Sequence, residues 1–323
     1  MNNIPMYCNR VGERDSRIDC LKFWLIIFVV FGHITQFTFY DHEAFSVHLV
    51  RRIIRSIYLF HMPLFIMISG YFSRKKEKKS FLKDIVKLVK VYFIFHLFWI
   101  FIGIYNGRTI TFERFFHPSF TLWYLHCLII WRLFLQLIPS KLLSNTYLIM
   151  SMSLLISIFG GFIHVSNLLS LQRLFTFMPL FFLGYYAKEY GWFKKNYQLK
   201  WYYLFLPIVL IVIENIIRLD YWGRSPYDSM LDLIRRIFFL TSSVFISWGI
   251  IKLLPLNISL FSKEGKDVLF YYMYHSIVLY FIAAILQWMG IVANGYILLL
   301  VFISTMVILY FLRKIKILHI PLK

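Results

Sequence analysis

The chain has 323 residues and a formal net charge of +20; 60% of its residues are hydrophobic and 15% are charged. A soluble domain of this length does not need so much apolar surface, so the composition indicates an all-α, polytopic membrane protein. In a soluble chain so large a positive charge would point to nucleic acid. Here the basic residues lie between apolar segments, where they act as orientation signals and contact anionic lipid headgroups. We therefore expect membrane lipids as partners and no nucleic acid.

Ten apolar segments are predicted to form transmembrane helices, because about 20 apolar residues span the roughly 30 Å hydrocarbon core of a bilayer. Residues 1–20 are polar, and no small-residue cleavage site follows the first segment, so we expect that segment to be retained. Pro179 and Gly184 interrupt the sixth segment, which membrane helices tolerate. The ten segments are residues 21–40, 56–73, 84–105, 119–138, 146–164, 171–187, 201–217, 237–254, 268–289 and 291–312.

Lysine and arginine are distributed unevenly between the two sides of these segments. With a cytoplasmic N-terminus, every lysine falls on the inner side and all the outer basic residues are arginines. Since cytoplasmic loops carry the excess of basic residues, both termini are predicted to lie in the cytoplasm. The chain then divides into a cytoplasmic N-terminal segment (1–20), a membrane domain (21–312) and a cytoplasmic basic tail (313–323).

The outer arginines allow two interpretations, which the sequence leaves open. They are scattered over loops and helix ends, or some of them bind an anionic or sugar-phosphate acceptor through the bidentate fork of the guanidinium. These residues are Arg51, Arg52, Arg55, Arg108, Arg114, Arg173, Arg218, Arg224, Arg235 and Arg236.

Three histidines are predicted to lie at one depth within the membrane. From helical rise, His33 and His126 lie about 10 Å and His61 about 8 Å below the outer boundary. Ionisable side chains in such segments are costly and mark functional sites. His275 enters from the inner side, again about 10 Å deep, so we expect it at a different end of the same pathway.

The three histidines of the outer half support two kinds of chemistry. A histidine can take and return a proton near neutral pH, and a hydroxyl group needs such a base before it attacks an acyl group. Three histidines can also bind zinc and leave one position open for water. Because their spacing carries no local metal motif, we favour the first interpretation and expect no metal.

Lys22 is placed to work with His33 on the same helix. Eleven residues correspond to about three helical turns, so the two side chains share one face about 16 Å apart. Arg14, Arg17 and Lys22 form a basic entrance that attracts a polyphosphorylated donor. The spacing predicts that a donor held at Lys22 points its reactive group toward His33.

The sequence resembles the acyltransferase 3 family of integral membrane acyltransferases, particularly its fucose 4-O-acetylase-like branch. The resemblance covers nearly the whole chain, in the family's order. It rests mainly on two motifs, Ile18-Asp19-Cys20-Leu21-Lys22 with Val29-Val30-Phe31-Gly32-His33, and Phe60-His61-Met62-Pro63-Leu64-Phe65 with Ile68-Ser69-Gly70-Tyr71-Phe72. Weaker matches are Leu122-Trp123-Tyr124-Leu125, the run from Met178 to Tyr185, and Tyr274-His275.

The resemblance implies transfer of an acyl group, usually acetyl, from cytoplasmic acyl-CoA to a sugar hydroxyl of a cell-surface glycan or its lipid-linked precursor. Acyl-CoA is then a co-substrate, no cofactor is permanently bound, and the protein is a multi-pass protein of the cell (plasma or inner) membrane. His33 matches the family's catalytic histidine, and Lys22 stands where many members have arginine. The implied roles are catalytic for His33 and His61, acyl-donor binding for Lys22, Asp19 and Arg17, and acceptor-binding or site-supporting for Trp123, His126 and His275.

Two other functions fit the same composition. A proton-coupled glycan or small-solute transporter would also use intramembrane histidines, although the two halves show no duplicated pattern of the kind transporters often have. A structural subunit of a glycan-assembly complex would tolerate replacement of His33 and Lys22.

Overall fold

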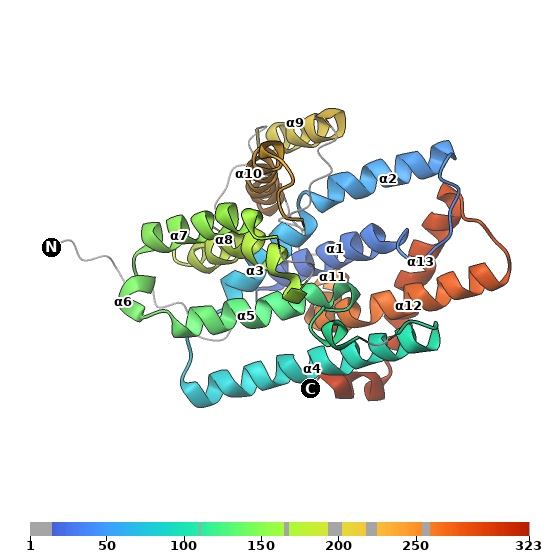
Figure 1. The fold of residues 1–323 in the computed structure, drawn as a ribbon, viewed down its shortest axis with the longest axis horizontal. Coiled ribbons are helices and arrows are strands. Elements are labelled where there is room, and N and C mark those ends of the chain that lie inside the picture. The colour runs from blue at the N-terminus through green and yellow to red at the C-terminus, as the bar shows by residue number, and fades with distance from the viewer. Residues whose placement is uncertain are drawn as a thin grey trace.

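The computed structural model describes residues 15–109, 111–164, 168–192, 202–217, 225–253 and 259–322. Within these ranges the protein is all-helical, and one isolated β-bridge pairs Tyr40 with Ala293. Helix α1 lies centrally, with α2, α3, α11, α12 and α13 around it (Figure 1). The helices are α1 (Ser16–His33), α2 (Phe45–Tyr58), α3 (His61–Phe72), α4 (Lys78–Tyr105), α5 (Trp123–Leu137), α6 (Ser140–Leu143), α7 (Thr146–Phe159), α8 (Leu171–Ala187), α9 (Tyr202–Ile217), α10 (Met230–Leu253), α11 (Ser259–Glu264), α12 (Val268–Trp288) and α13 (Gly295–Leu312). Short 3-10 helices are η1 (Phe112–Phe115), η2 (Phe120–Leu122), η3 (Gly160–Phe162), η4 (Leu168–Ser170), η5 (Gly265–Asp267) and η6 (Lys316–Leu322).

Each of the ten predicted segments overlaps a helix, and α8 matches its predicted bounds, with Pro179 inside it. Among the described residues, six helical stretches are long and apolar enough to cross a membrane. The chain is therefore an all-helical membrane protein, while the number of ten spans and the side of the termini stay predictions. The six stretches are Phe45–Phe72, Lys78–Tyr105, Phe120–Leu137, Met230–Lys252, Ser259–Trp288 and Gly295–Leu312.

The first helix differs from its predicted span of 21–40 at both ends. It begins at Ser16, because the Asp15 side chain accepts a hydrogen bond from the backbone N–H of Arg17 at 3.0 Å and caps the helix. It ends at His33, after Gly32, a poor helix former. The chain then reaches Tyr40, whose neighbours pair with Ala293 through two backbone hydrogen bonds of 2.8 and 3.0 Å. His33 is thus the last residue of its helix.

The predicted span 56–73 is two helices rather than one. Pro63 has no N–H to donate to the carbonyl of Leu59, so the helical ladder cannot continue there. The hydroxyl of Ser243 on α10 donates to this carbonyl instead, at 2.6 Å. The helix is therefore interrupted between α2 and α3, and α3 begins at His61. Arg51 and Arg55, which are predicted to lie on the outer side of the membrane, are consequently within α2 and not in a loop.

Helices α3 and α8 cross at two glycines. A Cβ atom added at Gly184 would overlap the backbone carbonyl of Met67, and one added at Gly70 would overlap the carbonyl of Phe181. Small residues let membrane helices approach this closely. The crossing brings α8 against the helix that begins with His61.

Gly184→Ala is expected to destabilise the protein by at least about 1–3 kcal/mol, the usual cost of overpacking, because the obstacle is backbone and cannot rotate away. Denaturation of the purified protein in detergent measures this. Gly32→Ala is the matched control, since its Cβ would meet only the ring of Tyr58, at 3.8 Å. Equal stability of the two variants would contradict the proposed crossing.

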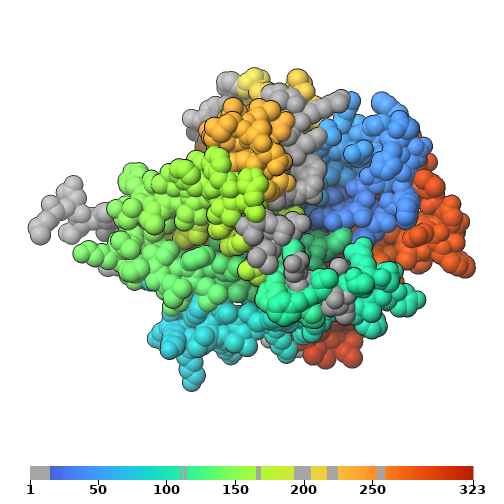
Figure 2. Space-filling model, in the orientation of Figure 1, coloured from blue at the N-terminus to red at the C-terminus, as the bar shows by residue number. Residues whose placement is uncertain are grey.

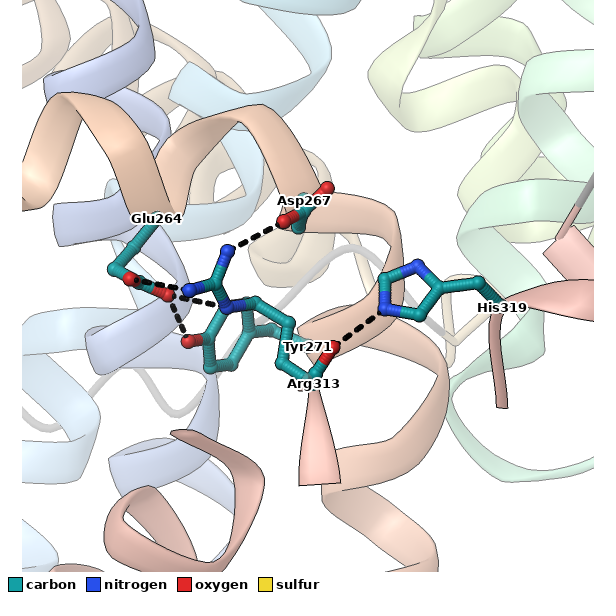
Figure 3. Close-up of polar contacts among 5 residues, drawn as sticks. All are labelled: Glu264, Asp267, Tyr271, Arg313 and His319. Carbon is teal, nitrogen blue, oxygen red and sulfur yellow. Dashed lines mark hydrogen bonds and ion pairs between the residues drawn. The ribbon is translucent and has the colours of Figure 1, made fainter. Parts of the chain in front are cut away.

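A cluster of ion pairs joins the end of α13 to α11 and η5 (Figure 3). Arg313 donates to Asp267 at 2.7 Å and to Glu264 at 2.9 Å, and the Tyr271 hydroxyl also donates to Glu264. Burial acts to lower the pKa of Arg313, but the hydrogen bond to Asp267 and the charge of Glu264 outweigh it and raise the pKa. We call Glu264, Asp267, Tyr271 and Arg313 the Arg313 cluster.

The segment that carries the Arg313 cluster packs against the N-terminal part of α1. Gly265 follows Glu264, and a Cβ there would overlap the backbone carbonyl of Asp19. The segment predicted as a basic tail is structured. Arg313 belongs to the Arg313 cluster, and Lys316–Leu322 form η6. The predicted N-terminal segment 1–20 lies mostly outside the described residues; its last five residues, from Ser16, belong to α1.

Candidate active site

A cavity of about 510 Å³ lies at the C-terminal end of α1. We call it the His33 cavity. It takes side chains from α1, α2, α3, α5, α8, α10 and α12, and from the turn that follows α1. Its polar and aromatic lining residues include His33, Thr35, Gln36, Tyr40, Arg51, Arg55, Tyr58, His61, Phe120, Thr121, Trp123, Arg173 and Tyr272.

His33 lines this cavity, and its side chain is half-buried. Its ring stacks on that of His275, with centroids 5.5 Å apart and an interplanar angle of 27°. Its Nδ1 atom is buried and has no hydrogen-bond partner among the described residues. Gln36, one turn later, is a hydrogen-bonding neighbour of the ring. As the last residue of α1, His33 lies at the negative end of the helix dipole, which partly offsets the cost of charging its ring.

His61 and His275 are fully buried, and each is fixed in one tautomer by backbone carbonyls. The Nδ1 atom of His61 lies 2.8 Å from the carbonyl oxygen of Ile57, and that of His275 lies 2.8 Å from the carbonyl oxygen of Tyr272. A carbonyl only accepts, so Nδ1 carries the proton in both rings and Nε2 keeps its lone pair. Neither Nε2 atom has a partner within the described ranges. Of these two imidazoles, His61 lines the cavity, and His275 contacts it through its stacking on His33.

Tyr58 connects His61 to α1. Its hydroxyl donates to the backbone carbonyl of Gly32 at 3.1 Å, and its ring lies 4.9 Å from the ring of His61 and 6.4 Å from that of His33. Tyr58 is not among the site residues predicted from the sequence. The signal was the helical spacing of Arg51, Arg55 and Tyr58, which becomes visible once residues 45–58 are treated as a helix.

Three of the arginines predicted to lie on the outer side, Arg51, Arg55 and Arg173, line the His33 cavity. The guanidinium of Arg173 lies 4.9 Å from the ring centroid of Trp123, a cation–π contact. None of the described residues that line the cavity is Asp or Glu. The lining is therefore positively charged, which raises the local concentration of an anionic ligand.

The histidine grouping differs from the predicted one. His126 does not line the cavity; it lies on α5 beside the ring of Tyr92, 5.5 Å away. His275, expected at a different end of the pathway, stacks on His33 instead. The predicted grouping was based on counting from the ends of apolar segments, whereas α1 ends seven residues before Tyr40 and α3 begins at His61.

The three residues assigned to donor binding lie in the first two turns of α1, away from the cavity. The Lys22 Nζ atom is 3.2 Å from Asp19 and 4.2 Å from the ring centroid of Phe72, while Arg17 pairs with Asp15 at 3.0 Å. Asp19 is buried, and its ion pair with Lys22 limits the movement of the lysine side chain. Because α1 is continuous from Ser16 to His33, Lys22 and His33 are about 16 Å apart along one helix.

Metal-binding geometry is not found in the part of the chain that the structure describes: no group of three or more His, Cys, Asp or Glu side chains there could hold a metal ion. The described lining of the cavity offers imidazole, guanidinium and hydroxyl groups.

Comparison with known proteins gives one family. The family model for an acyltransferase domain matches residues 15–314. The nodulation protein NolL of Mesorhizobium japonicum is 26% identical over 233 residues, which cover 67% of this chain and 58% of that protein. NolL of Sinorhizobium fredii is 43% identical over 63 residues, 19% of this chain and 16% of that protein. The matched regions thus span less than two thirds of either relative, and no solved structure matches.

Proposed function

Since the chain belongs to the acyltransferase domain family, we propose that it is a membrane O-acyltransferase that moves an acyl group, in particular acetyl, from cytoplasmic acyl-CoA to a sugar hydroxyl. The acceptor is a cell-surface glycan or its lipid-linked precursor, and the protein resides in the cell membrane. The observation that carries the proposal is the His33 cavity, where a base and cationic side chains surround a space large enough for a sugar.

The proposed reaction uses the imidazoles as proton acceptors. An acceptor hydroxyl placed beside His33 gives up its proton to the ring as its oxygen attacks the carbonyl carbon of the thioester. The new C–O bond forms, the C–S bond breaks, and the CoA thiolate leaves and takes up a proton. His61 lies across Tyr58 from His33 and offers a second basic nitrogen.

The donor is proposed to bind at the opposite end of α1. Lys22, held by Asp19, supplies a positive charge for the phosphates of acyl-CoA, and Arg17 lies five residues before Lys22 on the same helix. The thioester then has to reach about 16 Å along α1 to His33. Trp123 supports the site from the cavity wall and His275 by stacking on His33, whereas a supporting role for His126 would have to act through Tyr92.

Labelled acetyl-CoA supplied to the purified protein is expected to transfer its label to a saccharide, and His61→Asn is expected to lower this rate at least tenfold. Asparagine can keep the hydrogen bond to Ile57 but lacks Nε2, so the fold is retained while the base is lost. Mass spectrometry of the saccharide measures transfer. The proposal fails if wild type transfers no label but instead drives proton-coupled solute uptake into vesicles without acyl-CoA.

A further inference from the structure

A second hollow on the protein shares residues with the His33 cavity. It is a groove of about 430 Å³ along α2, lined by Phe45, His48, Leu49, Arg51, Arg52 and Arg55. We call it the α2 groove. Arg51 and Arg55 line both the groove and the cavity, so the two spaces meet at this pair of arginines.

The order of side chains along α2 gives the groove a direction. Arg51, Arg55 and Tyr58 lie within about 60° of one another around the helix, facing the cavity, and Tyr58 is 6.4 Å from His33. Phe45 and Leu49 lie further round the helix and toward its start, and both are largely exposed, at 83% and 51%. From one end to the other the path runs from apolar side chains, through two arginines, to the histidines, about 20 Å from Phe45 to Tyr58 by helical rise.

Helix α2 has a buried face that leaves this path on the surface. Val47, Val50, Ile54 and Ile57 are buried, and the start of α2 is held to α13, where the Gly295 N–H bonds to the Ser46 hydroxyl at 3.1 Å. Figure 2 shows the α2 region in blue at the surface of the molecule. The groove therefore lies on an exposed face of the molecule.

We propose that the α2 groove and the arginine pair bind an acceptor in which the saccharide is joined through a phosphate group to a hydrocarbon chain. The inference rests on the proposed function and narrows its acceptor. The hydrocarbon chain lies along Phe45 and Leu49, the phosphate is held by Arg51 and Arg55, and the sugar enters the His33 cavity beside Gln36 and Trp123. Arginine suits this position because its planar fork binds phosphate oxygens in bidentate fashion.

The test uses three acceptors with the same hexose: an alkyl phosphate diester of the sugar, the neutral alkyl glycoside, and the sugar phosphate without a chain. Glucose, galactose, fucose and rhamnose versions are supplied with labelled acetyl-CoA to the full-length protein in uncharged nanodiscs. We expect wild type to prefer the alkyl phosphate form. Arg51→Ala and Arg55→Ala should lower kcat/KM for that form by about tenfold to a hundredfold, as loss of a charged hydrogen bond does, with little change for the neutral glycoside.

Arg108→Ala is the matched control, because Arg108 is an exposed arginine that lines neither the α2 groove nor the His33 cavity. It should change kcat/KM less than threefold. Phe45→Ser and Leu49→Ser should instead reduce the advantage of the alkyl phosphate over the chain-free sugar phosphate. All these variants replace exposed or half-exposed side chains, so folding is retained.

Several outcomes would overturn the inference. Equal use of the phosphate and neutral acceptors by wild type would show that no phosphate is recognised. A rise in KM for acetyl-CoA in Arg51→Ala, with the acceptor unaffected, would assign the arginines to the donor. An equal loss with every acceptor that follows the phospholipid charge of the nanodisc would make the groove a site for bulk lipid.

A binding measurement separates this inference from the proposed function. An alkyl phosphate with a photoreactive tail should cross-link to α2 in wild type and in Arg108→Ala, but not in the Arg51→Ala, Arg55→Ala double variant. Cross-linking without any acyl transfer would leave the groove standing and refute the enzyme. Transfer without the predicted cross-link would do the reverse.

Discussion

Replacing His33 by alanine is expected to lower the rate of acyl transfer by about 10²–10⁴-fold, the factor that a positioned general base supplies. The ring lines the cavity, stacks on His275 at 5.5 Å and is followed by no further helical residue. Its removal therefore takes away the proton acceptor with little effect on packing. Single-turnover transfer from labelled acetyl-CoA measures the change.

His126→Ala is the matched control for this variant, since it removes a second imidazole of the membrane domain that does not line the cavity. It should retain wild-type transfer. If the His33→Ala protein also retains full transfer, the catalytic assignment is wrong.

The same assay also distinguishes direct transfer from an acyl-histidine intermediate. When labelled donor is added without acceptor, label that stays on the wild-type protein and is absent from His33→Ala indicates that His33 carries the acyl group. Label found on neither protein, with transfer lost in His33→Ala, indicates that His33 moves only the proton.

Arg313→Ala is expected to destabilise the fold by about 3–5 kcal/mol, as breaking a buried ion pair does. Arg313 and Glu264 expose only 13% and 2% of their side chains, so the variant leaves a buried carboxylate without its charge partner. Chemical denaturation in detergent measures the loss. Arg313→Lys should fall between wild type and Arg313→Ala, because lysine keeps the charge but cannot bind Glu264 and Asp267 with one planar group.

Lys76→Ala provides the comparison for an exposed pair. Lys76 and Asp84 expose 43% and 39% of their side chains, and such a pair contributes about 0–1 kcal/mol. A similar loss in Lys76→Ala and Arg313→Ala would mean that the Arg313 cluster does not hold the helices together.

The helical class and the approximate positions of the helices follow from the sequence because long apolar segments are visible without tertiary information. Helix α8 has its predicted bounds even with Pro179 inside, and Trp131 and Ser157 donate to the carbonyls of Leu174 and Thr176, on either side of the carbonyl that the proline leaves free. Helix α2 was missed as a separate helix because its arginines interrupt its apolar residues along the sequence, so no long apolar run marks it.

The site was only partly predictable for a different reason. His33, His61 and Trp123 line the cavity, and the local motifs that contain them were evident in the sequence. The stacking of His275 on His33 depends on how α12 packs along α1, which no local pattern encodes. The break before His61 depends on Pro63 together with Ser243, a residue 184 positions further along the chain than Leu59.

Because α1 is one continuous helix, its length fixes the distance between the residues at its two ends. Asp15 caps one end, Gly265 presses on the carbonyl of Asp19, and His33 completes the other end. One residue inserted between Lys22 and His33 would turn the imidazole by about 100° and carry it about 1.5 Å further, out of step with the cavity. Only changes of whole turns would keep both ends in phase, so this stretch has far less freedom to vary in length than the loops around it.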